Sequence, residues 1–214
     1  RSISPVVVEI PEFVPSDPSA NIGRSDEFGL NMNWGTGSDR GRSPGGFGKP
    51  GSIPGMLTGR LYDFKQKPDG KLASEYLANP RSQYIKNIKQ LQRRNFSKST
   101  LKAFFTAPTE LSISHLGIPF TSASQGPKFF DAADQVEPSG WIAHYQGVVE
   151  VPESGRYRFV GMGDDYLAVL INQRPRLIAA WSDIQDEVKA GWHEGRDSHT
   201  WKSPIGNAKL VTGD

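Results

Sequence analysis

The sequence contains no cysteine, and this absence removes several classes of protein at once. Without thiols the chain cannot form a disulfide scaffold, bind zinc through thiolates or use a cysteine nucleophile. The sequence also lacks an apolar run long enough to cross a membrane. Its 214 residues are enough for one principal domain with a substantial core.

An excess of charge of one sign is also missing. The 25 lysines and arginines nearly balance the 23 aspartates and glutamates, which leaves a formal net charge of +2 at pH 7. Because the basic residues are scattered along the chain, no concentrated positive surface for nucleic acid is expected. The sequence starts at Arg1 without a methionine, so we expect a mature or trimmed form of a longer protein.

Residues 1–55 are predicted to be an extended arm followed by a linker. Residues 1–19 hold a β-branched run interrupted by prolines, which suits an edge strand or an arm because proline cannot donate to a sheet. The stretch that follows, up to about residue 55, is rich in Gly, Ser and Pro and has few side chains able to bury surface. We therefore expect the folded domain to span residues 56–214.

The folded domain is expected to begin with a strand and to continue into a helical segment over about residues 80–106. The strand is MLTGRLYDF, residues 56–64. Asn79 is placed to cap a helix that starts at Pro80, and one face of this helix holds Tyr84, Ile88 and Leu91. Ser97 is placed to cap a second helix, whose apolar residues are Leu101, Phe104 and Phe105.

From about residue 108 the apolar residues recur with a period of two, which is typical of strands. Residues 141–161 predict an antiparallel hairpin, in which Trp141 and Tyr145 face the core while His144 and Gln146 face away. Residues 166–171 and 176–181 predict a second strand pair. The expected fold class is mainly β, an antiparallel β-sandwich with a short helical insertion. The sequence stops where another strand would begin, so we expect the domain to continue beyond it.

The segment GWIAHYQGVVEVPESGRYRFVGMGDDYLAVLIN, residues 140–172, resembles the protective antigen fourteen-kilodalton domain family. The residues that carry the resemblance are Tyr145, Gly147, Pro152, Gly155, Tyr157, Phe159, Asp164 and Asp165. The resemblance covers about residue 55 to the end and implies a β-sandwich of the kind found in bacterial toxins, glycosidases and flocculin-type adhesins. More loosely, the glycine-rich linker with LYDFKQ and HYQG resembles exported proteins of planctomycete and verrucomicrobial type, a likeness that names no activity.

In the flocculin-like branch, the resemblance implies that Asp164 and Asp165 hold a calcium ion, which in turn binds sugar hydroxyls. Calcium takes about six to eight oxygen ligands, and carboxylates, amide oxygens and hydroxyls can supply them. We therefore name Asp164 and Asp165 as metal ligands, and these two with Trp192 and Asn207 as ligand-binding residues. The alternative is a tight loop in which both carboxylates accept backbone N–H groups.

Catalysis is not expected from these residues. Adjacent carboxylates are poorly disposed for glycoside hydrolysis, in which the two groups face each other across roughly 5 to 9.5 Å. His193 and His199 lie in HEGRDSHT, a spacing that matches no helical metal motif, so a solvated loop is the simpler interpretation.

The sequence therefore predicts a non-catalytic carbohydrate-recognition module of an exported or envelope protein, with calcium as the mediator. The contrasting prediction is a structural or protein-interaction module of a cell-envelope assembly, without a sugar or metal site. A third alternative is an accessory domain of a larger hydrolase. The expected location is extracytoplasmic, meaning periplasmic, cell-surface or secreted. The expected partner is carbohydrate or an envelope protein, with neither nucleic acid nor a membrane span.

Overall fold

A computed structural model of the chain describes residues 46–114, 122–149, 157, 159–161, 165–180, 184, 187–188, 200–202 and 209–213. These residues hold more strand than helix, and every strand pair among them is antiparallel. The prediction of a mainly β chain with antiparallel sheets is confirmed at this level. The described residues do not show a sandwich.

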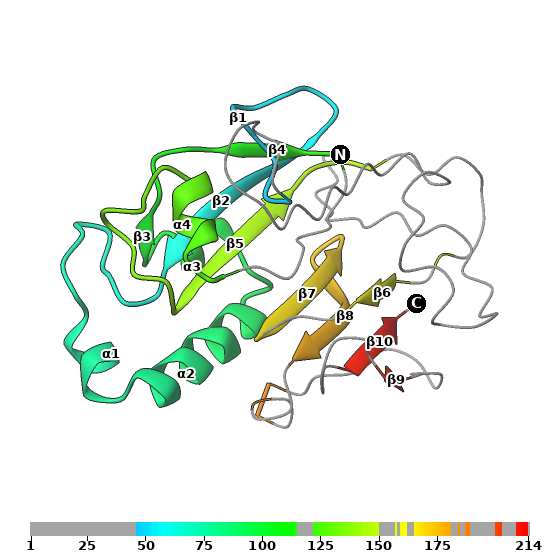
Figure 1. The fold of residues 1–214 in the computed structure, drawn as a ribbon. Coiled ribbons are helices and arrows are strands. Elements are labelled where there is room, and N and C mark those ends of the chain that lie inside the picture. The colour runs from blue at the N-terminus through cyan, green and yellow to red at the C-terminus, as the bar shows by residue number, and fades with distance from the viewer. Residues whose placement is uncertain are drawn as a thin grey trace.

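The main sheet is built around β2 (Leu57–Asp63), as Figure 1 shows. One edge of β2 pairs with β4 (Leu111–Ile113) and β3 (Phe105–Thr106), and the other edge pairs with β5 (Trp141–Gln146). The short strand β1 (Lys49–Pro50) extends the sheet beyond β4. Alternation along β2 sends Leu57 and Leu61 to one face and Tyr62 to the other, and all three side chains are buried. The main sheet is therefore covered on both faces.

One face of the main sheet is covered by α4 (Gln125–Phe129) and the chain that follows it. The core on this side consists mainly of Phe47, Leu57, Leu61, Leu111, Phe130, Val136 and Tyr145. The ring of Tyr145 contacts Gly59 so closely that a Cβ at this position would overlap it. Strands β2 and β5 therefore depend on a glycine to fit the tyrosine between them.

Residues 46–55 belong to the folded domain, so the domain boundary predicted at residue 55 is too late. Phe47 is 3% exposed, and its carbonyl oxygen accepts a hydrogen bond from the Tyr145 hydroxyl at 2.7 Å. The Ser112 hydroxyl donates to the Gly51 carbonyl at 2.6 Å and accepts from the Ile53 N–H at 2.9 Å. The composition misled because one aromatic residue anchors a segment otherwise rich in Gly and Pro. Residues 1–45 of the predicted arm and linker lie outside the described residues.

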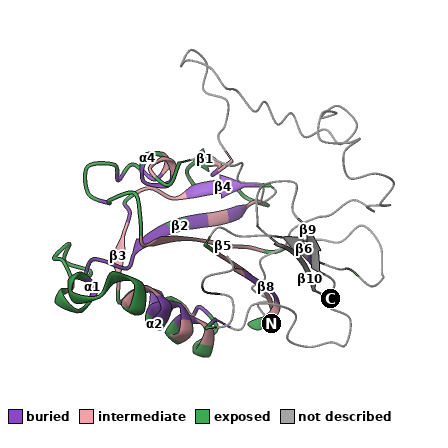
Figure 2. Cartoon of the chain, turned by 60° about the horizontal axis from the view of Figure 1, so that its bottom comes forward, coloured by how far each residue is buried: buried purple, intermediate pink, exposed green. Residues whose placement is uncertain are grey.

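The other face of the main sheet is covered by helices, and Figure 2 shows α1 and α2 on the side opposite α4. The helices are α1 (Ser74–Ala78), α2 (Pro80–Arg93) and α3 (Lys98–Leu101). The start of α2 is as predicted, because the Asn79 side chain accepts a hydrogen bond from the Ser82 N–H at 3.1 Å. The predicted apolar face of α2 is also confirmed, since Tyr84, Ile88 and Leu91 belong to or pack against the core on this side.

The second predicted helix is shorter than the sequence suggests. It ends at Leu101, and Phe105 lies in strand β3. Ser97 precedes the helix as predicted, but its side chain makes no capping bond to a backbone N–H. Its hydroxyl is instead hydrogen-bonded to the Thr100 hydroxyl at 2.8 Å.

β7 (Tyr166–Ile171) and β8 (Arg174–Ala180) form the second predicted strand pair. The residues between them, Asn172 and Gln173, have φ values of 51° and 64°, as a two-residue turn matched to the strand twist requires. One face of this hairpin packs against the helical core through Tyr166, Ala168, Leu170 and Ala180. The opposite face packs around Val169, Leu177 and Phe159.

The hairpin predicted over residues 141–161 is not formed by the described residues of that range. β5 pairs with β2, whereas β6 (Phe159–Gly161) pairs with β10 (Lys209–Gly213), which also pairs with β9 (Thr200–Lys202). The alternation of the sequence predicted the faces of β5 correctly, because Tyr145 is buried in the core and Trp141 packs against it. Alternation sets the face of a strand, but it does not choose the partner strand.

Candidate functional site

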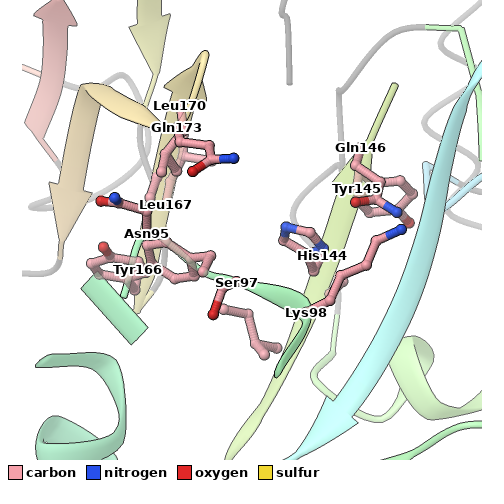
Figure 3. Close-up of a pocket in the computed structure, with 14 residues that line it drawn as sticks. Asn95, Ser97, Lys98, His144, Tyr145, Gln146, Tyr166, Leu167, Leu170 and Gln173 are labelled. Atoms are coloured by element: carbon pink, nitrogen blue, oxygen red, sulfur yellow. The ribbon is translucent and has the colours of Figure 1, made fainter. Parts of the chain in front are cut away.

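A cleft of about 330 Å³ opens between β5 and β7. Its walls come from β5 (residues 142–146), from β7 (Tyr166, Leu167, Ala168 and Leu170) and from the turn between α2 and α3 (residues 95–98). Gln173, in the turn after β7, completes the described lining. Figure 1 shows β5 and β7 running alongside each other, and Figure 3 shows the side chains that face the space between them. The cleft thus joins segments that are far apart in the sequence.

The polar residues of β5 reach the cleft because of the alternation along this strand. Tyr145 points into the core, so its neighbours His144 and Gln146 project from the opposite face of the sheet. In Figure 3 the imidazole of His144 and the amide of Gln146 lie on the β5 side of the cleft. The prediction that these two side chains point to the face opposite Tyr145 is confirmed.

The turn between α2 and α3 brings a second set of residues to the cleft. The N–H groups of Asn95 and Phe96 donate to the carbonyls of Gln92 at 3.0 Å and Leu91 at 2.8 Å, which ends α2 in a Schellman arrangement. Asn95 takes the positive φ of 50° that this arrangement needs. The Phe96 ring stacks against Tyr166 with the ring centroids 6.2 Å apart, which fixes the turn against β7.

The electrostatics of the cleft depend on Lys98 and His144. Burial, together with the smaller effect of the nearby positive charge of Lys98, lowers the pKa of His144 to about 4. His144 is therefore neutral at pH 7 and can both donate and accept a hydrogen bond. Of the described residues that line the cleft, only Lys98 carries a full charge at this pH. The part of the lining that the structure describes combines one ammonium with neutral polar groups.

Tyr166 contributes its ring to the cleft wall, and its hydroxyl is buried. Burial raises the pKa of Tyr166, while the side chain of Gln92 is close enough to lower it slightly. The hydroxyl makes no hydrogen bond of acceptable geometry with the residues that the structure describes. Within this part of the chain, Tyr166 therefore acts through its ring surface.

The sequence named four ligand-binding residues, of which the structure describes one. Asp165 is exposed and lies directly before Tyr166, so it is adjacent to the strand that forms one wall of the cleft. Burial raises the pKa of Tyr76, and the charges of Asp63 and Asp165 add to this effect, which places the Asp165 carboxylate within electrostatic reach of α1. Asp164, Trp192 and Asn207 lie outside the described residues.

The predicted calcium site and the two histidines of HEGRDSHT also fall largely outside the described residues. His193 and His199 fall outside the described residues, as does one of the two proposed metal ligands, Asp164. Among the residues that the structure does describe, no group of three or more His, Asp or Glu side chains could hold a metal ion. The binding of calcium by the acid pair remains a prediction.

The sequence reasoning missed Asn95, Lys98 and Gln173 as cleft residues. Asn95 carried a usable local signal, because asparagine directly after a helix favours the left-handed turn that ends it. Lys98 and Gln173 carried no local sequence signal. Lys98 reaches the cleft because α3 packs beside β5, and Gln173 reaches it because the β7–β8 hairpin does. Long-range packing of this kind leaves no local pattern.

A second polar cluster, formed by Asp63, Lys65 and Gln66, lies at the end of β2. Asp63 is completely buried. Its Oδ1 accepts from the Lys65 N–H at 3.0 Å and from Lys65 Nζ at 2.7 Å, while its Oδ2 accepts from Gln66 Nε2 at 2.8 Å. This cluster accounts for the polar residues of LYDFKQ.

The same two side chains hold the loop before β5. Lys65 Nζ donates to the carbonyls of Ser139 and of Glu137, the latter at 3.4 Å, and Gln66 Nε2 donates to the carbonyl of Gln135 at 2.5 Å. Because the carboxylate, the ammonium and the amide nitrogen are all engaged by protein groups, the cluster is structural rather than a ligand site.

Comparisons of the chain with known protein families, with curated proteins and with solved structures find no match. The described part of the chain includes no helix with both the length and the apolar character needed to cross a membrane. The fold is mainly β with antiparallel strand pairs, and a cleft with polar and aromatic lining lies beside β5 of the main sheet.

Proposed function

We propose that the chain is a non-catalytic carbohydrate-recognition module of an exported or envelope protein, and that the sugar lies in the cleft between β5 and β7. One observation carries the proposal: amide and imidazole groups face aromatic and aliphatic surface within one hollow of about 330 Å³. Sugars present hydroxyls that both donate and accept hydrogen bonds, together with C–H faces that pack on rings. A cleft with both kinds of surface suits them.

Three side chains are suited to bind hydroxyls. The amides of Gln146 and Gln173 and the neutral imidazole of His144 each supply a donor and an acceptor. Figure 3 shows Gln173 on the β7 side of the cleft and the other two on the β5 side. The partly buried side chains of Tyr166, Leu167 and Leu170 supply the apolar surface, and the buried ring of Phe96 supports Tyr166 from behind.

The proposal extends to the surroundings of the cleft. We propose a protective-antigen-type β-sandwich, an extracytoplasmic location, and calcium held by Asp164 and Asp165 as a mediator of sugar binding. The support for calcium is positional, because Asp165 is exposed and directly precedes the strand that lines the cleft. An ion held there would act at the end of β7.

Binding to a glycan array, with and without a calcium chelator, tests the recognition function. The wild-type chain should bind at least one glycan class, and Gln146→Ala should weaken that binding about fivefold, as expected for one lost hydrogen bond of about 1 kcal/mol. The matched control is Gln90→Ala, which changes an exposed glutamine of α2 outside the cleft lining. An array without any glycan signal above background would remove the proposal.

Thermal unfolding tests the calcium step separately. Calcium at about 100 times its Kd would stabilise the native state by about 2.7 kcal/mol and raise the Tm by several degrees. Asp164→Asn should abolish this increase, whereas Asp69→Asn, which changes an exposed carboxylate paired with Lys71, should keep it. Sugar binding that survives the chelator would leave the recognition function in place without calcium.

The alternative function is that of a protein-interaction module, and the sheet edges favour it. Among the described residues, β5 is hydrogen-bonded only to β2, and β7 only to β8. Within the part of the chain that the structure describes, each strand therefore has one edge without a hydrogen-bonded neighbour, and an extended segment of an envelope protein could add there. An envelope protein retained by the wild-type chain but not by Gln146→Ala, together with a blank glycan array, would favour this alternative.

A further inference from the structure

Lys98 is a cleft lysine without a counter-charge among the described residues. This residue begins α3 immediately after the turn that packs on β7, and it is exposed to solvent. In Figure 3 its side chain extends along the β5 side of the cleft toward Gln146. No ion pair of Lys98 is found within the described residues. The ammonium is therefore available to a ligand.

The other charges near this position are accounted for. Arg60 lies opposite His144 in the register of β2 and β5, and its guanidinium forms an ion pair with Glu110. Asp165 precedes Tyr166, at the opposite end of β7 from Leu170, and its charge acts on Tyr76 of α1. The described lining contains no carboxylate. The described lining thus presents one positive charge among neutral groups.

The neutral groups around Lys98 can add donors to a bound anion. Gln146 and Gln173 carry amide N–H groups, and the neutral imidazole of His144 has one N–H. A carboxylate accepts several such bonds at once, and charge-assisted hydrogen bonds are stronger than neutral ones. A neutral hydroxyl at the same place would leave the ammonium without a counter-charge.

We infer that the cleft selects sugars that carry a carboxylate, with Lys98 as the residue that binds this group. The inference rests on the proposed function, because it names the class of sugar that the same cleft would hold. A sugar acid supplies a ring to pack on Tyr166 and Leu170, hydroxyls for the amides, and the counter-charge for the ammonium. Lys98 is then the specificity-determining residue.

The test uses D-glucuronate and D-glucose, which differ only in a carboxylate in place of a hydroxymethyl group, and acetate as a carboxylate without a sugar. Binding to the full chain is measured at pH 7 and low ionic strength by NMR titration. Wild-type protein should bind glucuronate at least fivefold more tightly than either glucose or acetate. The preference should shrink as salt is added, because salt screens an exposed charge.

Two lysine variants separate a local effect from a general one. Lys98→Gln should abolish the preference for glucuronate over glucose, and Lys98→Arg should retain most of it. Lys102→Gln makes the same change of net charge at an exposed residue outside the described cleft lining and should leave the preference intact. Equal losses in Lys98→Gln and Lys102→Gln would overturn the inference, because the effect would then come from net charge.

A second readout is His144, whose imidazole faces Lys98 from α3, Arg60 from β2 and Tyr166 from β7. A carboxylate bound in the cleft favours the charged imidazole, so glucuronate should raise the pKa of His144 above its value of about 4 in the free protein. Glucose should leave it unchanged. An unchanged pKa with saturating glucuronate would show that the carboxylate lies elsewhere and would overturn the inference.

The remaining outcomes distinguish this inference from the proposed function. Equal binding of glucose and glucuronate, or a glycan array with only neutral binders, overturns the selectivity for acids and leaves carbohydrate recognition standing. Acetate binding as tightly as glucuronate shows an anion site in which the sugar plays no part, which overturns the inference, and together with a blank array it overturns the proposed function as well. A blank array and no binding of any probe also overturn both.

Discussion

At the residue scale, the buried pair of Asp63 and Lys65 is a strong constraint on the fold. Asp63 is completely buried and Lys65 is 8% exposed, yet each charged group has several hydrogen-bond partners. Burying charges is costly, and this cost is offset only while both partners remain. The pair adds little net stability, but the loss of one member leaves the other without compensation.

Asp63→Ala should therefore lower the free energy of unfolding by about 3 to 5 kcal/mol, because the buried ammonium of Lys65 loses its counter-charge. Urea denaturation followed by circular dichroism measures this loss. Asp69→Asn is the matched control, since Asp69 is an exposed acid a few residues away and its removal should leave the unfolding midpoint unchanged. A loss of under about 1 kcal/mol in Asp63→Ala would show that the ammonium reaches water on its own.

His144 predicts a specific dependence of stability on pH. Its pKa is about 4 in the folded chain and near 6.5 when unfolded, so between these values the unfolded chain binds more protons. Lowering the pH from 6.5 to 4 should therefore destabilise the native state, by at most about 3 kcal/mol from this residue. The measurement is the difference in unfolding free energy between wild type and His144→Gln across this range. A difference that stays constant with pH would contradict the low pKa.

At the element scale, the two helix starts predicted from the sequence differ in mechanism. Asn79 accepts a hydrogen bond from the Ser82 N–H, whereas Ser97 bonds to the Thr100 hydroxyl. Only the first satisfies a backbone donor that the helix itself leaves unpaired. Both positions hold a residue type that commonly caps helices, but only Asn79 is followed by a proline at the first helical position.

Asn79→Ala should destabilise the chain by about 1 kcal/mol, the usual effect of removing a helix cap. Ser97→Ala should have a smaller effect, because no backbone N–H loses its partner. Thermal unfolding of the two variants under identical conditions provides the comparison. Equal destabilisation would mean that the Ser97 hydroxyl does cap α3 in solution.

The elements that sequence reasoning recovered are those with local signals. The strand β2 has its alternation, α2 has Asn79 and Pro80 at its start, and the β7–β8 hairpin has an asparagine that accepts a positive φ. The partner of β5 could not be predicted, because both β2 and the segment around β6 offer a compatible alternating strand. For the same reason the cleft was visible only in part, through His144 and Gln146.

At the scale of the whole molecule, the main sheet carries a core on each face, and the chain before β2 contributes to one of them. Phe47 contacts the rings of Phe129, Phe130 and Trp141, with centroid distances of 5.4, 6.3 and 6.2 Å. One residue thus fastens a segment rich in Gly and Pro to the fold. Its contribution should be comparable to that of a central core residue.

Phe47→Ala should lower the free energy of unfolding by about 3 to 5 kcal/mol, because it empties a packed aromatic site. Leu72→Ala is the control, since Leu72 is 54% exposed and its truncation should change stability by no more than about 0.5 kcal/mol. Urea denaturation gives both values. A similarly small loss of unfolding free energy in both variants would mean that the segment around Phe47 does not unfold together with the rest of the domain.

The loop that precedes β5 is held in a way that has an evolutionary consequence. The side chains of Lys65 and Gln66 donate hydrogen bonds to the backbone carbonyl oxygens of Gln135, Glu137 and Ser139. Every amino acid has a backbone carbonyl, so these bonds do not depend on the side chains of the loop. Substitutions at these three positions should therefore be tolerated, whereas insertions or deletions between them should not. Related sequences should therefore vary at residues 135, 137 and 139 while keeping the buried Val136 and the length of the loop. A library that randomises these three positions should yield far more folded members than one that inserts a single residue.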